Sequence, residues 1–285
     1  MEKKINPTAI KALSIDLDGT ALLPGAILGG RTKECLKRLM AGGIQVIINT
    51  GRAIESSQRY YEALGVEGSM VFFNGAEIAE VPDIRVIDSR LTSLEVIDYG
   101  IDLARSMDIH FQIYLPAGFG PVKESPWEAL LIDKMRPEVE MYRKLSSITP
   151  VVTDLKAAIN VPGLKGCIKG MFIIDPSLHD DIRRKMTDRF GSSIYIVRSF
   201  PTFLEIMDAG VSKGEGLKTV MRHRGLKPEE VIAFGDEDND LPMFSVAGFS
   251  AAPSNAKENV KQAADFIYGS CADEGLAVFL EDLFG

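Results

Sequence analysis

Short apolar runs alternate with helical patterns at both ends of this chain. Residues 12–17 and 44–48 are apolar runs of strand length, and residues 31–41 repeat apolar positions at helical spacing. The first elements predicted are strand 12–17, helix 31–41, strand 44–48, helix 54–64 and strand 70–73. The last are helix 212–223, strand 231–234, a short helix near Pro242, strand 248–250 and helices 256–264 and 273–283. Such alternation predicts an α/β fold with a Rossmann-like parallel sheet covered on both faces.

The middle of the chain follows a different pattern. Asn74-Gly75 is a strong turn signal, and residues 76–87 predict a β-hairpin around Pro82-Asp83. The elements predicted beyond it are helices 94–107 and 176–190, strands 110–115, 167–174 and 193–197, a loop at 116–126 and a mostly helical stretch to residue 145. We therefore predict a core made of residues 1–83 and 199–285, interrupted by an inserted α+β domain at residues 84–198.

Composition and charge narrow the class of partner. The 285 residues carry a formal net charge of −8 without a compensating basic cluster, so nucleic acid is not an expected partner. No apolar run approaches the length of a membrane span, so we expect a cytoplasmic protein with no membrane partner. Three widely spaced cysteines, Cys35, Cys167 and Cys271, favour reduced thiols over a disulfide framework. The oligomeric state is not predicted.

Two carboxylates follow the first predicted strand, in the segment Asp16-Leu17-Asp18-Gly19-Thr20. Residues i and i+2 of an extended chain face the same way, and in an open α/β sheet ligands bind beyond the carboxyl ends of the strands. We therefore expect Asp16 and Asp18 to enter one pocket. The alternative is a simple strand-to-helix turn rich in Asp and Gly.

A second acidic segment, Gly235-Asp236-Glu237-Asp238-Asn239-Asp240, follows another predicted strand. Its carboxylates repel one another unless a cation or solvent lies between them. The alternative is a solvated loop with Asp238 capping the next helix. Together with the first pair, the segment offers hard oxygen ligands for Mg²⁺, which typically takes one or two carboxylates plus substrate phosphate.

Two further segments have the character of phosphate ligands. Asn49-Thr50-Gly51-Arg52 follows a predicted strand and precedes a helix. A hydroxyl and backbone N–H groups should therefore face the pocket, at a point where the helix N-terminus favours anions. Lys213 begins a predicted helix, where a lysine opposes the helix dipole unless it serves a nearby anion. The alternatives are an ordinary Thr cap and an isolated surface lysine.

These residues together suggest phosphoryl transfer. We take Asp16 as the candidate nucleophile, which would form an aspartyl-phosphate. Asp18 would protonate the leaving oxygen and then deprotonate the attacking water. Mg²⁺ and Lys213 would neutralise charge on the transferring group, while Thr50 and backbone amides hold its oxygens.

The order of these segments resembles the haloacid dehalogenase superfamily and, within it, the Cof-like phosphatases with a C2B-type cap. The four superfamily motifs are matched by Asp16-Leu17-Asp18-Gly19-Thr20, Asn49-Thr50-Gly51-Arg52, Ser212-Lys213-Gly214 and Gly235-Asp236-x-x-Asn239-Asp240, and a stretch typical of the family by Phe73-Asn74-Gly75-Ala76. The resemblance implies that Asp16 and Asp236 bind Mg²⁺ by their side chains and Asp18 by its backbone carbonyl, with Asn239 and Asp240 in the next shell. The predicted phosphate or substrate ligands are Asp16, Thr50, Gly51, Arg52, Asn74, Lys213 and Asn239.

The resemblance also implies that the inserted domain is a cap that closes over the crevice and selects the substrate. Candidate contact residues in it are His110, Gln112, Tyr114, Trp127 and Arg198, each of which also suits packing or surface exposure. In relatives, a later loop often reads Met-Gly-Asn-Ala, whereas this chain has Ala252-Pro253-Ser254-Asn255-Ala256. This departure argues against transferring a relative's substrate directly.

The function predicted is hydrolysis of a small phosphate monoester, such as a sugar phosphate or a related metabolite. A phosphomutase using the same intermediate is the nearest enzymatic alternative, and product analysis would separate the two. A phosphometabolite-binding protein without turnover is a third possibility. A receiver domain also uses Asp, Thr and Lys around Mg²⁺, but the order of the residues here differs from that of a receiver.

Overall fold

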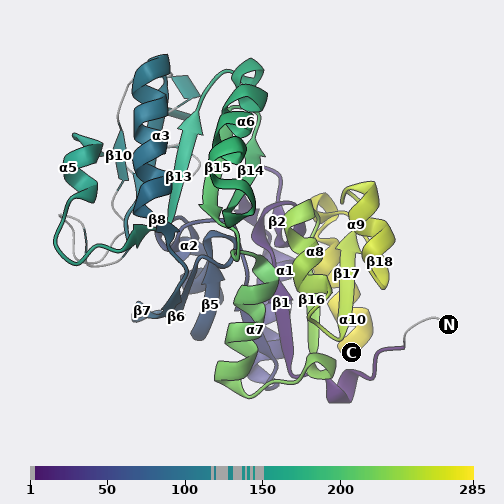
Figure 1. Cartoon of the computed structure of the whole chain (residues 1–285). Helices are drawn as coiled ribbons and strands as arrows, with labels where there is room; N and C mark the ends of the chain where they lie inside the picture. The colour runs from purple at the N-terminus through teal and green to yellow at the C-terminus, as the bar shows by residue number, and fades with distance from the viewer. Residues whose placement is uncertain are drawn as a thin grey trace. The chain divides into compact units, whose positions relative to one another are not determined.

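The computed structural model describes residues 4–116, 119, 128–130, 137–138, 140–141, 144 and 151–285 (Figure 1). The chain forms two compact units. The first comprises Met1–Gly51, Ser57–Ile87 and Ser212–Gly285, and the second comprises Arg52–Ser56 and Asp88–Val211. In the described part of the chain, no helix is both long enough and apolar enough to cross a membrane.

The first unit is built on a five-stranded parallel sheet. Its strands are β1 (Ala12–Ile15), β4 (Gln45–Ile48), β16 (Val231–Phe234), β17 (Phe249–Pro253) and β18 (Phe266–Tyr268), in the spatial order β18-β17-β16-β1-β4. In the central strand, Leu13 lies opposite Val46 on one side and Ile232 on the other. All four residues of β1 are buried, as expected for a strand covered on both faces. The predicted α/β class with a parallel sheet is confirmed.

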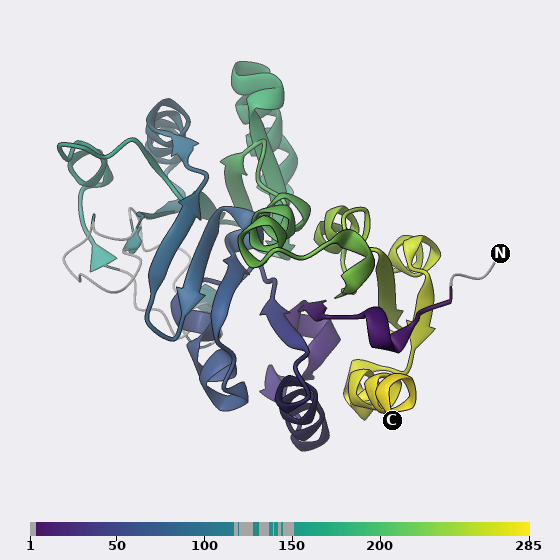
Figure 2. The same cartoon turned by 90° about the horizontal axis from the view of Figure 1, so that it is seen from below.

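Helices cover both faces of this sheet. They are α1 (Gly30–Ala41), α2 (Ile54–Leu64), α7 (Lys213–Arg224), α8 (Leu241–Phe244), α9 (Glu258–Ala263) and α10 (Gly275–Phe284). Leu217 and Val220 of α7 pack with Met243 of α8 in one apolar cluster against the sheet. The view from below shows α1 and α10 on the opposite face (Figure 2). A short hairpin, β2 (Leu22–Leu23) and β3 (Ile27–Leu28), follows β1.

The third predicted strand belongs mainly to a separate sheet. β5 (Gly68–Phe72) pairs antiparallel with β6 (Glu77–Val81), which is followed by β7 (Arg85–Ser89). β5 meets the parallel sheet through a single parallel bridge, between Asn49 and Val71. The physical reason is a tight turn in which Phe73 and Asn74 have positive φ, because this turn sends the chain back along β5. The predicted hairpin is confirmed, but the strand before it is not a full member of the parallel sheet.

The second unit has a mixed sheet with helices on one face. Its main strands are β9 (His110–Tyr114), β10 (Glu128–Leu130), β11 (Val151–Val152), β13 (Lys169–Ile173), β14 (Ile194–Phe200) and β15 (Phe203–Asp208), in the order β11-β10-β9-β13-β15-β14. The helices are α3 (Leu94–Met107), α5 (Leu155–Ile159) and α6 (His179–Phe190), and a small sheet pairs β8 (Thr92–Ser93) with β12 (Gly166–Cys167). Phe111 and Ile113 of β9 join the apolar cluster beneath α3 and α6. Most of the predicted loop 116–126 and of the predicted helical stretch to residue 145 lies outside the described residues.

Candidate active site

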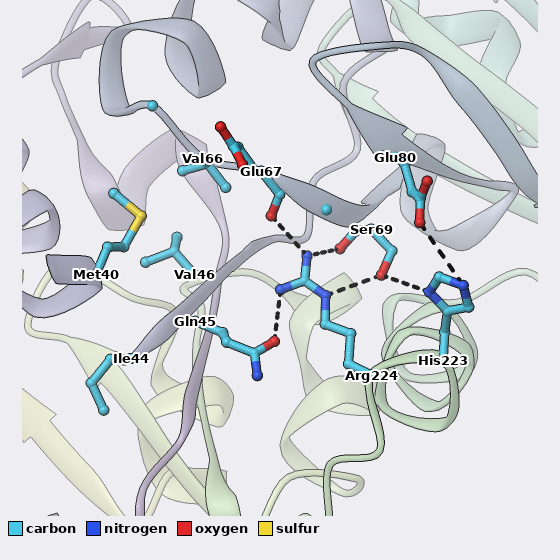
Figure 3. Close-up of a pocket in the computed structure, with 12 residues that line it drawn as sticks. Met40, Ile44, Gln45, Val46, Val66, Glu67, Ser69, Glu80, His223 and Arg224 are labelled. Atoms are coloured by element: carbon cyan, nitrogen blue, oxygen red, sulfur yellow. Dashed lines mark hydrogen bonds and ion pairs between the residues drawn. The ribbon is translucent and has the colours of Figure 1, made fainter. Parts of the chain in front are cut away.

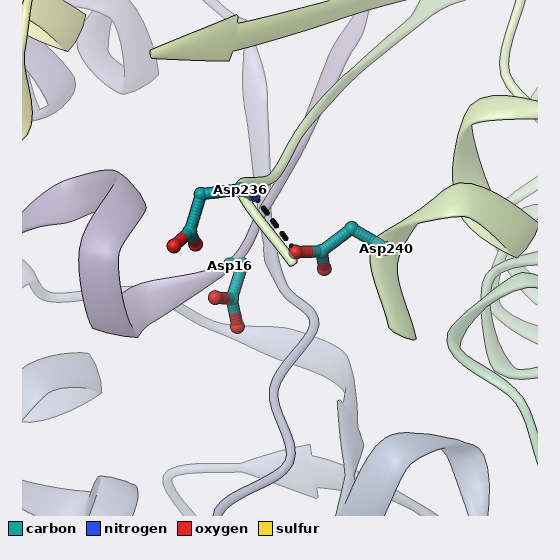
Figure 4. Close-up of side chains that lie close together, drawn as sticks. All are labelled: Asp16, Asp236 and Asp240. Carbon is teal, nitrogen blue, oxygen red and sulfur yellow. Dashed lines mark hydrogen bonds between the residues drawn. The ribbon is translucent and has the colours of Figure 1, made fainter. Parts of the chain in front are cut away.

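Acidic side chains meet at the carboxyl edge of the parallel sheet. Asp16 follows β1 directly, Asp236 lies two residues beyond the end of β16, and Asp240 lies in the turn after that (Figure 4). All three are buried, and one carboxylate oxygen from each lies within 4.8 Å of those of the other two. Segments more than 200 residues apart in the sequence thus form one acidic cluster.

Lys213 bridges two of these carboxylates from the first turn of α7. Its Nζ lies 2.7 Å from Oδ1 of Asp16 and 2.6 Å from Oδ1 of Asp240, and its side chain is only 1% exposed. Burial lowers the pKa of Lys213, but the two carboxylates outweigh that effect and raise it above its ordinary value. Lys213 is therefore a fixed positive charge inside the acidic cluster. The amide of Asn49 donates to the Lys213 carbonyl over 3.0 Å and ties the start of α7 to the end of β4.

Both oxygens of Asp240 are engaged by the protein. Oδ1 contacts Lys213, while Oδ2 accepts the backbone N–H groups of Asp236 and Glu237, each over 2.9 Å. Because its acceptor positions are filled, Asp240 is suited to orienting Lys213 and the loop of Asp236. These contacts agree with the predicted place of Asp240 in the next shell around the metal, and that role stays a prediction.

Asp236 is held by the turn that follows Asp16. The Thr20 hydroxyl donates to Oδ1 of Asp236 over 2.8 Å. Gly19 adopts a φ of +73°, and a Cβ built on it would lie 2.2 Å from Oδ2 of Asp236, so a side chain is excluded there. Burial and, next, the neighbouring Asp240 raise the pKa of Asp236 to about 7.

The cluster has the donor set of a divalent-cation site. Burial is the main cause that raises the pKa of Asp16 well above its ordinary value, and Asp240 and Asp236 add to it, while Lys213 opposes the shift. The described residues offer no hydrogen-bond donor to Oδ2 of Asp16 or Oδ2 of Asp236. Two unengaged carboxylate oxygens amid unneutralised negative charge fit a hard cation such as Mg²⁺.

Asp18 lies near this cluster, and several of the phosphate-ligand candidates contact one another. Asp18 is exposed, and its charge contributes to raising the pKa of Asp16. Thr50 is buried, and its carbonyl accepts the N–H of Asn74 over 3.0 Å. The Asn74 Oδ1 in turn accepts the side-chain amide of Asn239 over 2.9 Å. The structure thus links the ends of β4 and β5 with the loop after β16.

Two of the remaining candidates differ in where they lie. A Cβ on Gly51 would lie 2.9 Å from Oδ1 of Asn74, so Gly51 adjoins this network. Arg52 is half-buried and belongs to the short segment grouped with the second unit. Their proposed contacts with phosphate stay predictions.

The whole pattern agrees with one family. A model of haloacid dehalogenase-like hydrolases matches residues 13–280. This chain belongs to the haloacid dehalogenase-like hydrolase family. The predicted resemblance is confirmed, and the match spans both units.

Relatives of this haloacid dehalogenase-like chain include named phosphatases. It is 27% identical to the 5-amino-6-(5-phospho-D-ribitylamino)uracil phosphatase YitU of Bacillus subtilis, with 95% of this chain and 97% of that protein covered. It is 28% identical to the HMP-PP phosphatase of Serratia proteamaculans, with 94% and 93% covered. A crystal structure of a haloacid dehalogenase-like hydrolase from Bacteroides thetaiotaomicron matches with a TM-score of 0.85 at 26% identity, covering 96% of this chain and 100% of that one.

Sequence reasoning missed several residues that shape this haloacid dehalogenase-like site. Thr20 lies inside the first acidic motif, and its bond to Asp236 gives it a place in the cluster. Asn49 is fully buried and holds the Lys213 carbonyl. Their positions directly beside predicted motifs were a signal, but their partners lie far away in the sequence.

The candidate substrate contacts of the second unit fall into two groups. His110, Gln112 and Tyr114 alternate along β9 on the face away from Phe111, and they are buried. His110 Nε2 lies 3.2 Å from Oε1 of Gln112, whose amide donates to the Tyr114 hydroxyl over 3.1 Å. Arg198 of β14 is exposed, and Trp127 lies outside the described residues. Their contact with a substrate stays a prediction.

A separate cavity lies in the first unit at the amino ends of β4 and β5 (Figure 3). It has a volume of about 560 Å³, typical of small-molecule pockets, and none of the predicted site residues lines it. Arg224, the last residue of α7, donates to the Ser69 hydroxyl, to Oε1 of Gln45 and to the carbonyls of Ser69 and Glu67. Burial lowers its pKa to about 10. The four neutral acceptors make Arg224 a clamp between α7 and the two strands.

Proposed function

We propose that this chain is a Mg²⁺-dependent phosphatase that hydrolyses a small phosphate monoester through an aspartyl-phosphate. The observation that carries the proposal is the buried Asp16 carboxylate, which lies beside Asp236 and Asp240 and whose Oδ1 is 2.7 Å from Nζ of Lys213. Family membership and the phosphatase names of the relatives support the same reaction class.

In the first step, a carboxylate oxygen of Asp16 attacks the phosphorus atom and forms a new P–O bond. The bond between phosphorus and the ester oxygen breaks, and the leaving oxygen takes a proton from the Asp18 carboxyl group. The products of this step are a free alcohol, an aspartyl-phosphate at Asp16 and an ionised Asp18.

In the second step, the Asp18 carboxylate removes a proton from a water molecule. The water oxygen attacks phosphorus, the bond to Asp16 breaks, and inorganic phosphate leaves. Asp16 is again a carboxylate and Asp18 again carries the proton. The exposed position of Asp18 beside buried Asp16 supports this division of roles.

The charge on the transferring group has several candidate partners. Asp16 and Asp236 would hold Mg²⁺ by their side chains and Asp18 by its carbonyl, and the ion would supply electrostatic stabilisation of the phosphoryl oxygens. Lys213 adds a fixed positive charge, held in place by Asp240. Thr50, Gly51, Arg52, Asn74 and Asn239 are the proposed phosphate or substrate ligands.

The proposed substrate is a small phosphorylated metabolite. The relatives named above act, by their names, on a phosphorylated ribitylaminouracil and on HMP-PP, and these are small molecules with phosphate groups. Coverage above 90% in both directions makes a substrate of this size class the natural one to test.

The test is phosphate release from p-nitrophenyl phosphate with and without Mg²⁺. We expect wild-type activity to require the ion, and Asp16→Asn to abolish turnover because an amide is not a competent nucleophile. Asp18→Asn should lower turnover by about 10²–10⁴-fold, the usual range for general acid–base catalysis.

Asp238→Asn is the matched control, because Asp238 is an exposed carboxylate that contacts Lys257 and Asn259. It should retain wild-type rates. Full activity in Asp16→Asn would refute the nucleophile assignment, and Mg²⁺-independent turnover by wild type would refute the metal assignment.

A further inference from the structure

Asn255 joins two loops across the carboxyl edge of the sheet. It lies in the Ala252–Ala256 stretch, just after β17, and its Nδ2 donates to the Gly19 carbonyl over 2.8 Å. On the other side, its Oδ1 accepts the N–H of Cys271 over 2.9 Å and the hydroxyl of Ser270 over 3.3 Å. One exposed carboxamide thus joins the turn at Ser270 and Cys271 to Gly19, which lies 236 residues from Asn255 in the sequence.

Asn255 donates to the carbonyl of a glycine with a left-handed backbone conformation. Gly19 follows Asp18 and has a φ of +73°, and its carbonyl belongs to the peptide that joins it to Thr20, whose hydroxyl donates to Asp236. The short π-helical segment that contains these residues has non-helical dihedral angles at both Asp18 and Gly19. Fixing the Gly19 carbonyl therefore restricts how the backbone presents Asp18.

We infer that Asn255 is a positioning residue for phosphoryl transfer, which holds Asp18 in its proton-transfer orientation through the Gly19 peptide. The inference rests on the proposed function. Asn255 acts through Asp18 and donates no proton to the substrate. The Asn255–Gly19 hydrogen bond joins two loops of the fold itself, which is how a supporting residue fixes a catalytic group in place.

Asn255→Asp is the sharpest variant. The substitution keeps the side-chain shape and the Oδ1 acceptor for Cys271, but it replaces the Nδ2 donor by a carboxylate oxygen facing the Gly19 carbonyl. Because Asn255 is exposed, no cavity forms in the core. Asn255→Ala removes the donor without adding charge and serves as the second variant.

The measurement compares kcat/KM for phenyl phosphate and p-nitrophenyl phosphate, since this ratio reports the first irreversible step. Phenolate is the more basic leaving group and depends more on a general acid. We expect both variants to lose about tenfold or more on phenyl phosphate and about threefold or less on p-nitrophenyl phosphate. In the Asp18→Asn background, Asn255→Asp should cause no further loss on phenyl phosphate, because the two residues act as one unit.

The control is Asn259→Asp, which makes the same change at a nearby exposed asparagine that bonds Asp238. Asn259→Asp should not lower kcat/KM for one ester more than for the other. Equal losses on both esters, additive losses with Asp18→Asn, or unchanged kinetics would each overturn the inference. If wild type releases phosphate from neither ester, the proposed function itself fails, which is a distinct result.

Discussion

Three buried carboxylates cluster at the end of the parallel sheet, and one lysine contacts two of them. Asp16, Asp236 and Asp240 carry up to three negative charges, and Lys213 supplies a single positive one. Burying unneutralised charge costs free energy, and the raised pKa values of Asp16 and Asp236 express that cost. At the residue scale, the candidate site therefore destabilises the fold in the absence of a cation.

Replacing Asp236 with Asn should stabilise the metal-free protein at pH 8. The folded-state pKa of Asp236 is about 7, against 3.8 in the unfolded chain, so the native state binds more protons between these values. Stability from this group is fully present below pH 3.8 and is lost as pH rises through 7. We expect Asp236→Asn to raise the free energy of unfolding by about 1–3 kcal/mol at pH 8 and by less at pH 5.

Thermal unfolding in EDTA at the two pH values measures this difference. Asp238→Asn is the control, because hydrogen bonds from Lys257 and Asn259 lower the pKa of Asp238. Removing that charge should not stabilise the protein at pH 8. A lower melting temperature for Asp236→Asn at pH 8 would contradict the expectation.

The sequence predicted site residues that follow a single strand or begin a helix, but it did not predict the distant residues that hydrogen-bond to the site. Asp16 and Lys213 were identified because each follows a recognisable local pattern, and an unfavourable lysine at a helix start signals an anion nearby. Thr20 and Asn49 were missed because their hydrogen-bond partners come from segments about 160 to 220 residues away. Local spacing cannot identify such pairs.

At the scale of elements, α7 connects the two ends of the sheet. Lys213 starts the helix at the carboxyl edge, and Arg224 ends it at the amino edge, where it binds β4 and β5. Twelve residues at 1.5 Å each give a rod of about 18 Å. The clamp at Arg224 thus helps to fix the helix that presents Lys213.

Arg224→Lys should lower the free energy of unfolding by about 1–3 kcal/mol, because the carbonyls of Glu67 and Ser69 lose a planar donor. Urea unfolding monitored by circular dichroism measures the change. Arg222→Lys, at an exposed neighbour whose guanidinium donates to the Thr219 hydroxyl, should change the free energy of unfolding by about 0.5 kcal/mol or less. Equal effects of the two substitutions would rule out the clamp.

Helices whose apolar residues repeat at a clear helical period were predicted well. Short strands and strands joined by tight turns were not. The helices at residues 54–64 and 94–107 have the predicted bounds, since their apolar faces repeat over three turns or more. β18 and β15 were missed: the first has only three residues, and the second follows β14 after only two residues, whereas the predicted strand 193–197 overlaps β14 alone. The main pairing of β5 with β6, instead of with the parallel sheet, was not predicted, because it depends on the left-handed turn at Phe73 and Asn74.

At the scale of the whole molecule, Mg²⁺ should act as a stabilising ligand. An ion that binds only the folded protein adds about 2.7 kcal/mol at a concentration one hundred times its Kd. We expect added Mg²⁺ to raise the melting temperature of wild type at pH 8. The increase should vanish in Asp236→Asn and persist in Asp238→Asn, as measured by calorimetry. An equal increase in all three proteins would place the ion elsewhere.

The division of the chain into two units accompanies a change in the pattern of apolar and polar residues along the sequence. The parallel sheet was predictable from both ends of the chain, because the alternation of strands and helices there is typical of an α/β fold. The assignment of residues 84–198 as a cap remains a prediction, as do its proposed substrate contacts. Family membership supports the overall α/β architecture across residues 13–280.

The central place of β1 has a consequence for biosynthesis. Its neighbour β4 follows it closely in the chain, but its other neighbour, β16, is made more than 200 residues later. Until Val231–Phe234 emerges, β1 presents an unpaired apolar edge, the kind of surface that chaperones shield. The acidic cluster therefore stays incomplete until the segment from Lys213 to Asp236 has been made, because that segment supplies its lysine and its second carboxylate.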